Sequence, residues 1–366
     1  MPLKILLINP WQGEIYPPPS IGYLQATILD AGYNVRAVDL AVAMNEPDDY
    51  DIIGVTFHSF SVRYAKQIRE HFKKAHLVCG GHHPSAMPKQ MASIGYDQIV
   101  IGEGENAMID ILEGDREQFK WQSSDHYKTI NDIPFPDYRG LAHTDNVVIS
   151  SRGCPFRCNF CASTLFWGNR WRARSADNVI AEINHFGYQS WMFEDDNFTA
   201  NKKRAIEICS QVKGHWQCAS RAETLDDELC HALKKSGCHA VWLGIESFSP
   251  ASLERCNKNT SVEKMIRGIE CAEGHGIRTV CQFIIGLPGD TIHDILLTAK
   301  VIRNTRMSDF GGNIAWVLPG TEIYNQAKLR GMTDDVYLES GAPFYTYEHD
   351  MDTLLNWRNI LMNAKR

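Results

Sequence analysis

The sequence lacks several features that would place the protein in a special class. No apolar run in its 366 residues approaches the roughly 20 residues that a membrane-spanning helix needs. The first ten residues, MPLKILLINP, lack the layout of a secretory signal, because their short apolar stretch ends at once in polar residues and proline. Basic residues do not outnumber acidic ones, and the net charge of -7 argues against broad nucleic-acid binding. We therefore expect neither a membrane span nor a nucleic-acid partner.

Low-complexity tracts are also missing, and the composition is that of a globular protein. Hydrophobic residues make up 44% of the chain and charged residues 22%, which allows a sizeable core. The length suggests two domains. Eleven cysteines are many, but the number is odd and only three of them lie close together. Reduced thiols in a cytoplasmic protein therefore fit better than a disulfide framework.

The first third of the chain alternates short apolar strands with helix-like segments. Strands that are apolar on both faces are typical of a buried parallel sheet. With helices between them, they predict an α/β domain at residues 1–114 with a doubly wound, Rossmann-like or flavodoxin-like sheet. Ligands of such sheets bind at the carboxyl ends of the strands. The predicted strands are 3–9, 34–40, 51–58, 76–81 and 96–102, and the predicted helices are 21–31, 62–75, 85–94 and 106–112.

A second alternating region begins after residue 145. Residues 115–144 are polar, contain two prolines and show no periodicity, so we predict a linker there. Six βα units over 145–331 then predict a partial (β/α)6 barrel of the TIM type, with its chemistry at the carboxyl ends of the strands. Residues 332–366 are expected to form a helical cap over the barrel mouth. The predicted strands are 147–151, 190–195, 216–220, 240–247, 278–286 and 312–318, and the predicted helices are 176–186, 202–212, 226–236, 262–275, 291–304, 322–330 and 351–364.

The three clustered cysteines directly follow the first predicted barrel strand. Cys154, Cys158 and Cys161 have the spacing C-x3-C-x2-C. Three thiolates on one tight loop can hold three irons of a [4Fe–4S] cube, which leaves the fourth iron open. Zinc is the alternative, but a structural zinc normally takes four protein ligands, and no fourth Cys or His lies near in sequence. The spacing therefore favours the cluster.

This cysteine motif, with an aromatic residue before its last cysteine, resembles the signature of the radical S-adenosylmethionine (SAM) superfamily. Other segments resemble the SAM-binding motifs of that family in order, each at the end of a predicted strand. They are F-x-D-D-x-F at 193–198, S-R at 220–221, G-I-E-S at 244–247, F-I-I-G-L-P-G at 283–289 and L-P-G-T at 318–321. The resemblance implies that SAM contacts Phe160, Asp195, Asp196, Ser220, Arg221, Glu246, Ile285, Gly286 and Pro319.

Several of these residues also have a plainer structural interpretation. Asp195 and Asp196 would cap the predicted helix at 202–212. Glu246 would pair with a nearby arginine. The strand-end positions favour SAM binding in both cases. Aromatic residues beyond the cysteines either line a substrate pocket or pack on the cysteine loop. The cysteines from 209 to 281 are expected to be small buried hydrophobes.

Residues 1–114 resemble the cobalamin-binding domain that precedes many radical SAM domains. The segments that carry the resemblance are PPPSIGYL at 17–24, GGHHP at 80–84 and GEGE at 102–105. The motif D-x-H-x-x-G, whose histidine binds cobalt, is missing from the chain. We therefore expect either cobalamin without a protein histidine on the metal or a vestigial domain. The resemblance implies cobalamin contacts at Pro18, Ser20, Gly80, Gly81, His82, Gly102 and Glu103. His58 is a further candidate, because it ends a predicted strand at the ligand edge of the sheet.

These cobalamin positions have structural alternatives too. Gly80 and Gly81 fit a plain tight turn as well as a cofactor contact. His82 fits a loop position, and Glu103 fits the N-terminus of a helix.

The resemblance implies an enzyme that uses a [4Fe–4S] cluster to cleave SAM reductively. The resulting 5′-deoxyadenosyl radical would remove a hydrogen from a small-molecule or natural-product substrate. Cobalamin-dependent methylation of an unactivated carbon is the first expectation. A non-methylating rearrangement, dehydration, cyclisation or epimerisation is the second, and a non-catalytic cobalamin or metal sensor is the third. An external one-electron reductant of the flavodoxin or ferredoxin type is the implied partner.

Overall fold

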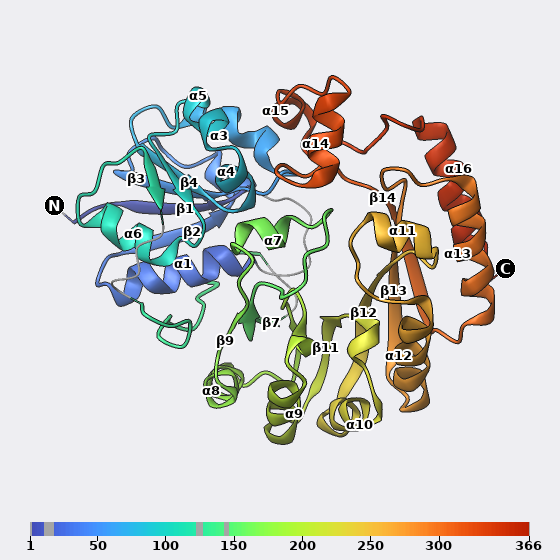
Figure 1. The fold of residues 1–366 in the computed structure, drawn as a ribbon. Helices are drawn as coiled ribbons and strands as arrows, with labels where there is room; N and C mark the ends of the chain where they lie inside the picture. The colour runs from blue at the N-terminus through green and yellow to red at the C-terminus, as the bar shows by residue number, and fades with distance from the viewer. Residues whose placement is uncertain (1, 11–17, 122–126, 143–145, 366) are drawn as a thin grey trace. The chain divides into compact units, whose positions relative to one another are not determined.

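The chain folds into two compact units, each with its own parallel sheet and hydrophobic core (Figure 1). The computed structural model describes residues 2–10, 18–121, 127–142 and 146–365. The first unit comprises Met1–Asp145 and Thr333–Pro343, and the second comprises Asn146–Met332 and Phe344–Arg366. Residues 332–366, expected to form one segment, are thus divided between the two units.

The first unit is built on a sheet of six parallel strands in the order β2-β1-β3-β4-β5-β6. This order, with β1 and β3 adjacent at the topological switch point, is that of flavodoxin-like folds. The doubly wound parallel sheet expected from the sequence is confirmed. The strands are β1 (Ile5–Asn9), β2 (Val35–Asp39), β3 (Ile52–Thr56), β4 (His76–Gly80), β5 (Gln98–Ile101) and β6 (Phe119–Trp121). The helices are α1 (Pro19–Asp30), α2 (Leu40–Ala43), η1 (Val62–Tyr64), α3 (Ala65–His71), α4 (His82–Ala86), α5 (Pro88–Ile94), α6 (Glu105–Leu112) and α15 (Val336–Ser340).

The first unit departs from the sequence prediction at several places, among them the unpredicted short helices α2 and α15. Strand β6 lies in the segment expected to be a linker and pairs in parallel with β5. Three residues are too few to show a strand period, so the sequence hid this strand. The helix predicted over 85–94 is replaced by α4 and α5, which meet at Met87. Pro88 has no backbone N–H to donate, so it begins a helix rather than continuing one.

The second unit holds six parallel strands in the order β14-β13-β12-β11-β10-β7. With a helix after most strands, this is the predicted partial β/α barrel, and the fold class is confirmed. Its sheet strands are β7 (Val147–Val148), β10 (Ser190–Phe193), β11 (His215–Ser220), β12 (Cys238–Glu246), β13 (Arg278–Ile285) and β14 (Asp309–Ile314). A short hairpin pairs β8 (Ser151–Arg152) with β9 (Arg172–Ala173). The helices are α7 (Ala162–Phe166), α8 (Ala176–Phe186), η2 (Phe198–Ala200), α9 (Lys202–Gln211), η3 (Ala222–Thr224), α10 (Asp227–Ser236), α11 (Pro250–Arg255), α12 (Val262–Gly274), α13 (Ile292–Asn304), α14 (Glu322–Leu329) and α16 (Met351–Met362).

Side chains alternate between the two faces of this second sheet. On β11, Trp216 and Cys218 are fully buried in the core that the strands share with the surrounding helices. Gln217, between them, is only partly buried and lies on the opposite, inner face. Its side-chain oxygen accepts a hydrogen bond of 2.9 Å from the indole of Trp242 on β12. The inner face therefore carries polar groups, whereas the outer face is a packed apolar core.

The last helix, α16, belongs to the outer layer of the second unit. Its residues Leu354, Trp357 and Leu361 are buried in the same core as β13 and α13, and Figure 1 shows α16 beside α13. We expected this segment over the barrel mouth. The apolar stripe of the helix instead covers the flank of the last strands, because those strands expose core residues there.

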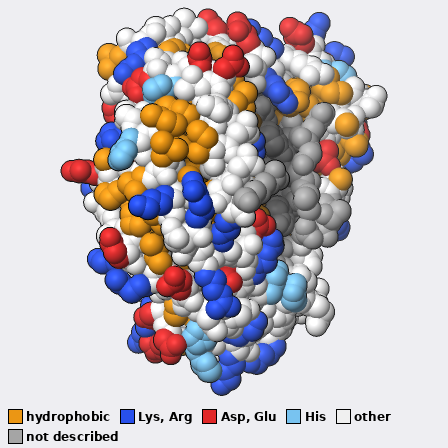
Figure 2. Space-filling view, turned by 90° about the vertical axis from the view of Figure 1, so that its right-hand side faces the viewer, with side chains coloured by type: hydrophobic (Ala, Val, Ile, Leu, Met, Phe, Trp, Pro, Cys, Tyr) orange, Lys and Arg blue, Asp and Glu red, His pale blue; other side chains and the backbone are white. Residues whose placement is uncertain are grey.

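The surface carries charges of both signs. On the face drawn in Figure 2, lysine and arginine side chains are interspersed with aspartate and glutamate. Across the described residues, no helix combines the length and the apolar character that crossing a membrane requires.

Candidate functional site

The three clustered cysteines lie on the loop between β8 and α7, at the carboxyl ends of the barrel strands. All three are partly exposed, as is Phe160 beside them, whereas seven of the other eight cysteines are buried. Burial raises the pKa of the Cys154 and Cys161 thiols, and the nearby Asp196 charge adds to the effect. Gly153 starts this cysteine loop at φ 88°, and an added Cβ would stand 2.0 Å from the carbonyl oxygen of Arg170. Only glycine fits there.

The cysteine loop is fastened to the C-terminal turn of α11, residues 255–258, which we call the α11 turn. The backbone N–H of Asn159 donates to the carbonyl of Cys256 at 3.2 Å, and its side-chain amide donates to the carbonyl of Arg255 at 2.8 Å. In return, the side-chain amide of Asn257 donates to the carbonyl of Arg157 at 2.6 Å. Three hydrogen bonds thus fix the position of the loop that carries the cysteines.

The buried carboxylate of Asp195 holds the chain on the way to the cysteines. Asp195 is 3% exposed, and its oxygens accept hydrogen bonds from the Ser150 N–H at 2.7 Å and from the hydroxyls of Ser150 and Ser151 at 2.6 and 2.5 Å. Burial raises its pKa, while these hydrogen bonds and the charge of Arg204 act in the opposite direction. Arg204 also donates to the carbonyl of Ser150 at 2.6 Å. Asp195 therefore stands as a positioning group.

Asp196 has different surroundings from its neighbour. Its side chain is exposed and accepts a hydrogen bond of 3.1 Å from the N–H of Gly153, at the start of the cysteine loop. Neither aspartate caps the following helix, so that alternative interpretation of the pair was wrong. The N-cap of α9 is Asn201, whose side chain accepts from the Arg204 N–H.

Arg221 reaches the cysteine loop from the end of β11. One guanidinium nitrogen lies 3.4 Å from the sulfur of Cys158, and the guanidinium carbon lies 3.9 Å from the centre of the Phe156 ring. The remaining nitrogens bind the carboxylate of Glu223 and the carbonyl of Lys258 in the α11 turn. A side chain with this many partners is held in one orientation, and its charge faces the cysteines.

Glu246 ends β12 in a strained conformation. Its φ is 65°, in the left-handed region that a side chain with a Cβ rarely adopts, and the strand register shifts between Gly244 and Glu246. The carboxylate binds the ammonium of Lys258 at 2.7 Å, and both side chains are nearly buried. The expected partner, an arginine, is thus a lysine. Non-glycine strain of this kind is typically found at functional sites.

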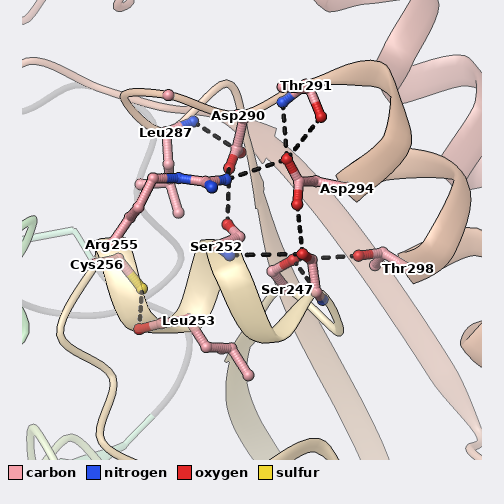
Figure 3. A network of polar contacts seen from close by, with 12 residues as sticks. Ser247, Ser252, Leu253, Arg255, Cys256, Leu287, Asp290, Thr291, Asp294 and Thr298 are labelled. Carbon is pink, nitrogen blue, oxygen red and sulfur yellow. Dashed lines mark hydrogen bonds and ion pairs between the residues drawn. The ribbon is translucent and has the colours of Figure 1, made fainter.

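A buried polar network behind α11 supports both Glu246 and the α11 turn (Figure 3). Arg255 binds Asp290 at 2.9 Å and Asp294 at 3.1 Å. Asp290 also accepts from the hydroxyl of Ser252 at 2.7 Å. The hydroxyl of Ser247, the residue after Glu246, lies 3.1 Å from that of Thr298 on α13. Burial raises the pKa of Asp290, against the opposing effect of Ser252 and Arg255.

Four further residues predicted to contact SAM have mainly structural partners. The hydroxyl of Ser220 is buried against those of Thr199 and Thr224. Ile285 is fully buried in the apolar core. Gly286 has a φ of 77°, and an added Cβ would meet Leu354 of α16 at 2.5 Å. Pro319 lies in the turn that leads to Thr321, the N-cap of α14. Ser220, Ile285 and Gly286 stand at or directly after strand ends, as predicted, whereas Pro319 lies five residues beyond β14, which ends at Ile314 rather than at residue 318.

In the first unit, the predicted cobalamin positions gather at the carboxyl edge of the sheet. His58 follows β3 at the switch point, and His82 opens α4 after β4. Burial lowers the pKa of each imidazole to about 4, so both are neutral at pH 7. Gly102, at φ 88°, has nothing within 4 Å of the place where a Cβ would stand. The edge thus offers neutral imidazoles and a backbone that a bulky ligand can approach.

Other predicted positions at this edge have structural explanations. Gly80 ends β4, and an added Cβ on Gly81 would meet the Phe57 carbonyl oxygen at 2.7 Å, so close packing alone requires that glycine. Glu103 is buried in the turn before α6, whose first turn contains Glu105. Pro18 caps α1 and Ser20 lies exposed in its first turn. Pro17, part of the PPPSIGYL segment, lies outside the described residues.

Comparison with known proteins agrees with this geometry. The family model for the radical SAM superfamily matches residues 148–302, and that for the B12 binding domain matches residues 12–112. A protein of Pyrococcus horikoshii named an uncharacterized methyltransferase is 31% identical, over 89% of this chain and 83% of its own length. The chain belongs to the radical SAM superfamily. The recognition made from the sequence motifs is therefore confirmed.

Two other similar proteins extend the comparison of this radical SAM protein. The anaerobic magnesium-protoporphyrin IX monomethyl ester cyclase of Rubrivivax gelatinosus is 25% identical, over 88% of this chain and 70% of its own length. The radical SAM methyltransferase TsrM from Kitasatospora setae, solved with cobalamin and a [4Fe–4S] cluster, has a TM-score of 0.72 at 18% identity. The match covers 89% of this chain and 78% of TsrM. At that identity, the likeness establishes the shared fold.

The cysteine loop of this radical SAM protein fits a cluster better than a single metal ion. A tetrahedral zinc with Zn–S bonds near 2.3 Å would bring its sulfurs to about 3.8 Å from one another. Among the described residues, the three thiols do not form a group whose ligand atoms all lie within 4.8 Å. A cube binds each cysteine through a different iron, so its thiolates stand further apart. The cationic Arg221 beside Cys158 also suits a thiolate.

The residues of the α11 turn and its supporting network were not predicted from the sequence. Lys258, Asn257 and Arg255 lie outside the strand-end motifs, and their importance comes from contacts with distant segments. One local signal was present: two asparagines flank Lys258 just after a short helix, and both adopt positive φ, at 54° and 51°. Asparagine is the residue that most often takes this conformation without glycine.

Proposed function

We propose that this protein is a cobalamin-dependent radical SAM methyltransferase that methylates an unactivated carbon of a small molecule. The observation that carries the proposal is the meeting of Arg221, Glu246 and the cysteine loop on one structural support, the α11 turn. The B12 binding domain ahead of it supports the choice of methyl transfer. So do the names of two similar proteins, the Pyrococcus methyltransferase and TsrM.

In this proposal, Cys154, Cys158 and Cys161 hold the [4Fe–4S] cluster and leave one iron for SAM. When bound, the cluster supplies the electron that cleaves SAM, and cobalamin supplies the methyl carrier. Arg221 points a guanidinium nitrogen toward the cysteine loop, where a carboxylate of SAM would be neutralised. Glu246 offers a carboxylate for hydroxyl groups, and the contact with the Lys258 ammonium holds it in one orientation.

Exposed polar groups on the inner face supply the surroundings of a substrate. Glu194 directly follows β10 and, two residues after Met192, continues the same face. Its side chain is solvent-accessible. The surrounding protein and the charges of Asp195 and Asp196 nevertheless raise the pKa of its carboxyl group. Gln217 and Trp242 form a hydrogen-bonded pair on the next two strands. These groups would orient a small polar molecule next to the SAM positions, and the outer core excludes water from behind.

A second candidate function is a non-methylating radical SAM reaction. The similarity to the Rubrivivax cyclase favours it, because that relative is named for a ring closure and is matched over most of both chains. The two candidates differ in their products. Methylation consumes two SAM molecules and releases S-adenosylhomocysteine together with 5′-deoxyadenosine, whereas the alternative releases no S-adenosylhomocysteine.

The deciding experiment measures both products from anaerobically reconstituted protein. The chain is loaded with iron and sulfide, incubated with hydroxocobalamin, desalted, and given SAM and a one-electron reductant of the flavodoxin type. We expect corrin absorbance to co-elute with the protein, and S-adenosylhomocysteine to appear only when corrin is present. SAM cleavage to 5′-deoxyadenosine by a protein that retains no corrin would favour the non-methylating candidate.

The SAM-binding role of Arg221 can be tested separately from the cluster. In cluster-replete protein, Arg221→Gln should weaken SAM binding about tenfold or more, since a charge-assisted contact is typically worth 1.5–3 kcal/mol. It should also lower the reduction potential of the cluster, because the donor beside the Cys158 sulfur is lost. Arg278→Gln, in an exposed pair on the same barrel, is the matched control. Unchanged SAM affinity in the Arg221 variant would reject the role.

A further inference from the structure

Outside the cysteine loop, α10 and α12 bring together a second set of metal-binding side chains. One ligand atom each from Asp227, Cys271 and His275 lies within 4.8 Å of the others. The nitrogen Nε2 of His275 stands 2.9 Å from a carboxylate oxygen of Asp227. The buried thiol of Cys230 lies near that of Cys271, which adds to the effect of burial in raising the pKa of Cys230. Three possible ligands of three chemical kinds therefore converge between two neighbouring helices, and the thiol of Cys230 stands beside one of them.

The spacing of these residues explains why they converge. Asp227 and Cys230 are three residues apart on α10, and Cys271 on α12 is four residues before His275, the C-cap residue of that helix. Residues at these separations lie on the same face of a helix, one turn apart. Each helix thus presents a pair of ligands, and the two pairs face each other. This arrangement departs from the sequence interpretation of these cysteines as plain buried hydrophobes, since Cys271 is partly exposed.

We propose that α10 and α12 hold a zinc ion through the grouped side chains of Asp227, Cys271 and His275, and that the neighbouring thiol of Cys230 reorients on binding to become the fourth ligand. Two thiolates, one imidazole and one carboxylate form a complete set for a tetrahedral structural zinc. The mixture is too soft for calcium or magnesium, which take oxygen ligands. The site is independent of the proposed methyl transfer, because it uses none of the residues assigned to the cluster, SAM or cobalamin.

The ion would link two neighbouring helices of the barrel wall. The carboxylate of Asp227 is 94% exposed on the first turn of α10, and the His275 side chain is 23% exposed. The site therefore stands at the surface at one end and is open to metal from solvent, whereas Cys230 closes it from inside. Ligand pairs on two separate helices make such an ion a cross-link that resists their separation.

The experiment counts zinc in a full chain that cannot build the cluster. Cys154, Cys158 and Cys161 are replaced by serine, so that metal bound elsewhere is measured alone. After equilibrium dialysis against Zn²⁺ under reducing conditions, we expect about one zinc per chain, as one four-ligand site requires. Cobalt(II) in its place should give a thiolate-to-metal charge-transfer band and the intense visible bands of a tetrahedral ion.

Single replacements in that background test the ligands. His275→Ala, Cys271→Ser and Asp227→Asn should each weaken zinc binding by about 100-fold or more, since even residues that merely orient a ligand cost 10–100-fold. The exposed His293→Ala on α13 is the control and should bind zinc normally. Asp227→Asn changes an exposed side chain, so it keeps the proposal testable if the cysteine variant unfolds. Zinc binding that survives both His275→Ala and Asp227→Asn, or no zinc at all, would overturn the proposal.

Discussion

At the scale of single residues, adjacent side chains at the end of β10 have separate tasks. Asp195 is buried and fixes Ser150 and Ser151, which lead to the cysteines. Asp196 is exposed and accepts a hydrogen bond from the N–H of Gly153 at the edge of the cysteine loop. The sequence motif presents the two carboxylates as a pair, but their surroundings make one a structural anchor and leave the other available to a ligand.

Replacing each aspartate should separate these tasks. Asp195→Ala leaves buried hydroxyls and an N–H without their acceptor, so we expect the free energy of unfolding to fall by about 3 kcal/mol. Asp196→Ala removes an exposed group and should change stability by about 0.5 kcal/mol or less. Urea titration of both variants measures the difference. Similar losses in the two variants would contradict the division of tasks.

The buried His83 makes the stability of the first unit depend on pH. It is fully buried, its ring nitrogens lie 3.0 Å from the Ser59 hydroxyl and 2.8 Å from the Gln90 side chain, and burial lowers its pKa to about 4. Between pH 6.5 and 4, the unfolded chain binds a proton at this histidine and the folded chain does not. The stabilising contribution of the neutral His83 is therefore fully present above the pKa of the unfolded chain, and it is lost as the pH falls through this window.

The expected contribution of His83 can be measured from the slope of stability against pH. The free energy of unfolding should fall by about 2 kcal/mol from this residue alone between pH 7 and pH 5. His83→Gln keeps polar partners for Ser59 and Gln90 but does not titrate, so its curve should be flatter by that amount. His293→Gln, at an exposed position, is the control. A His83→Gln curve parallel to that of the unmodified protein would reject this account.

At the scale of elements, the α11 turn joins three parts of the site that are distant in sequence. It bonds to the cysteine loop, to Arg221 through the Lys258 carbonyl and to Glu246 through the Lys258 ammonium. Its own position depends on Arg255 and the two carboxylates on the α13 side. A substitution in the network that supports the α11 turn should therefore weaken cluster binding at the cysteine loop.

Arg255→Ala tests this connection. The variant leaves Asp290 and Asp294 without their cation, and the partly exposed position of Arg255 limits the expected cost to about 1–3 kcal/mol. We also expect reconstituted protein to retain less iron, because the loop that Asn159 fastens to the turn is loosened. Arg278→Ala, in an exposed ion pair, should lose about 0–1 kcal/mol and keep its iron. Full iron retention in Arg255→Ala would refute the connection.

The elements themselves were largely predictable from the sequence. Five of the six strands of the first sheet and all six of the second were expected, because runs such as ILLIN at Ile5–Asn9 are apolar on both faces. The cysteine loop and the strand-end motifs followed from local spacing. Strand β6 was hidden because its three residues carry no period of their own.

What the sequence did not reveal depends on contacts across the fold. The lysine partner of Glu246 lies 12 residues beyond it, and Asn159 meets the α11 turn almost 100 residues away. The metal-binding set of Asp227 and His275 spans 48 residues. Each half of that set has helical spacing, yet the convergence of two helix faces is a property of packing. Pairings of this kind arise from tertiary structure, which local patterns do not encode.

At the scale of the whole molecule, two separate cores predict two responses to cofactors. One core belongs to the sheet of the first unit and the other to the barrel. A ligand stabilises the unit that binds it, by about 2.7 kcal/mol at a concentration 100 times its Kd. In calorimetry, hydroxocobalamin should therefore raise one unfolding transition, and cluster reconstitution with SAM should raise the other. Both ligands shifting the same transition, with the other unchanged, would contradict this assignment.

Among the described residues, the barrel sheet ends at β7 and β14, and two residue pairs join β7 to β10. The radius of a closed eight-stranded barrel is fixed, because the number of strands and their stagger determine it. A sheet with two free edges has no such closure constraint, so its curvature can adjust to the ligand that it encloses. We therefore expect that few substitutions on the inner face are needed for such a sheet to accept a larger or a smaller substrate. Tight binding of one substrate should reduce the fluctuations of this sheet. Amide hydrogen exchange should then slow most at its edge strands, β7 and β14.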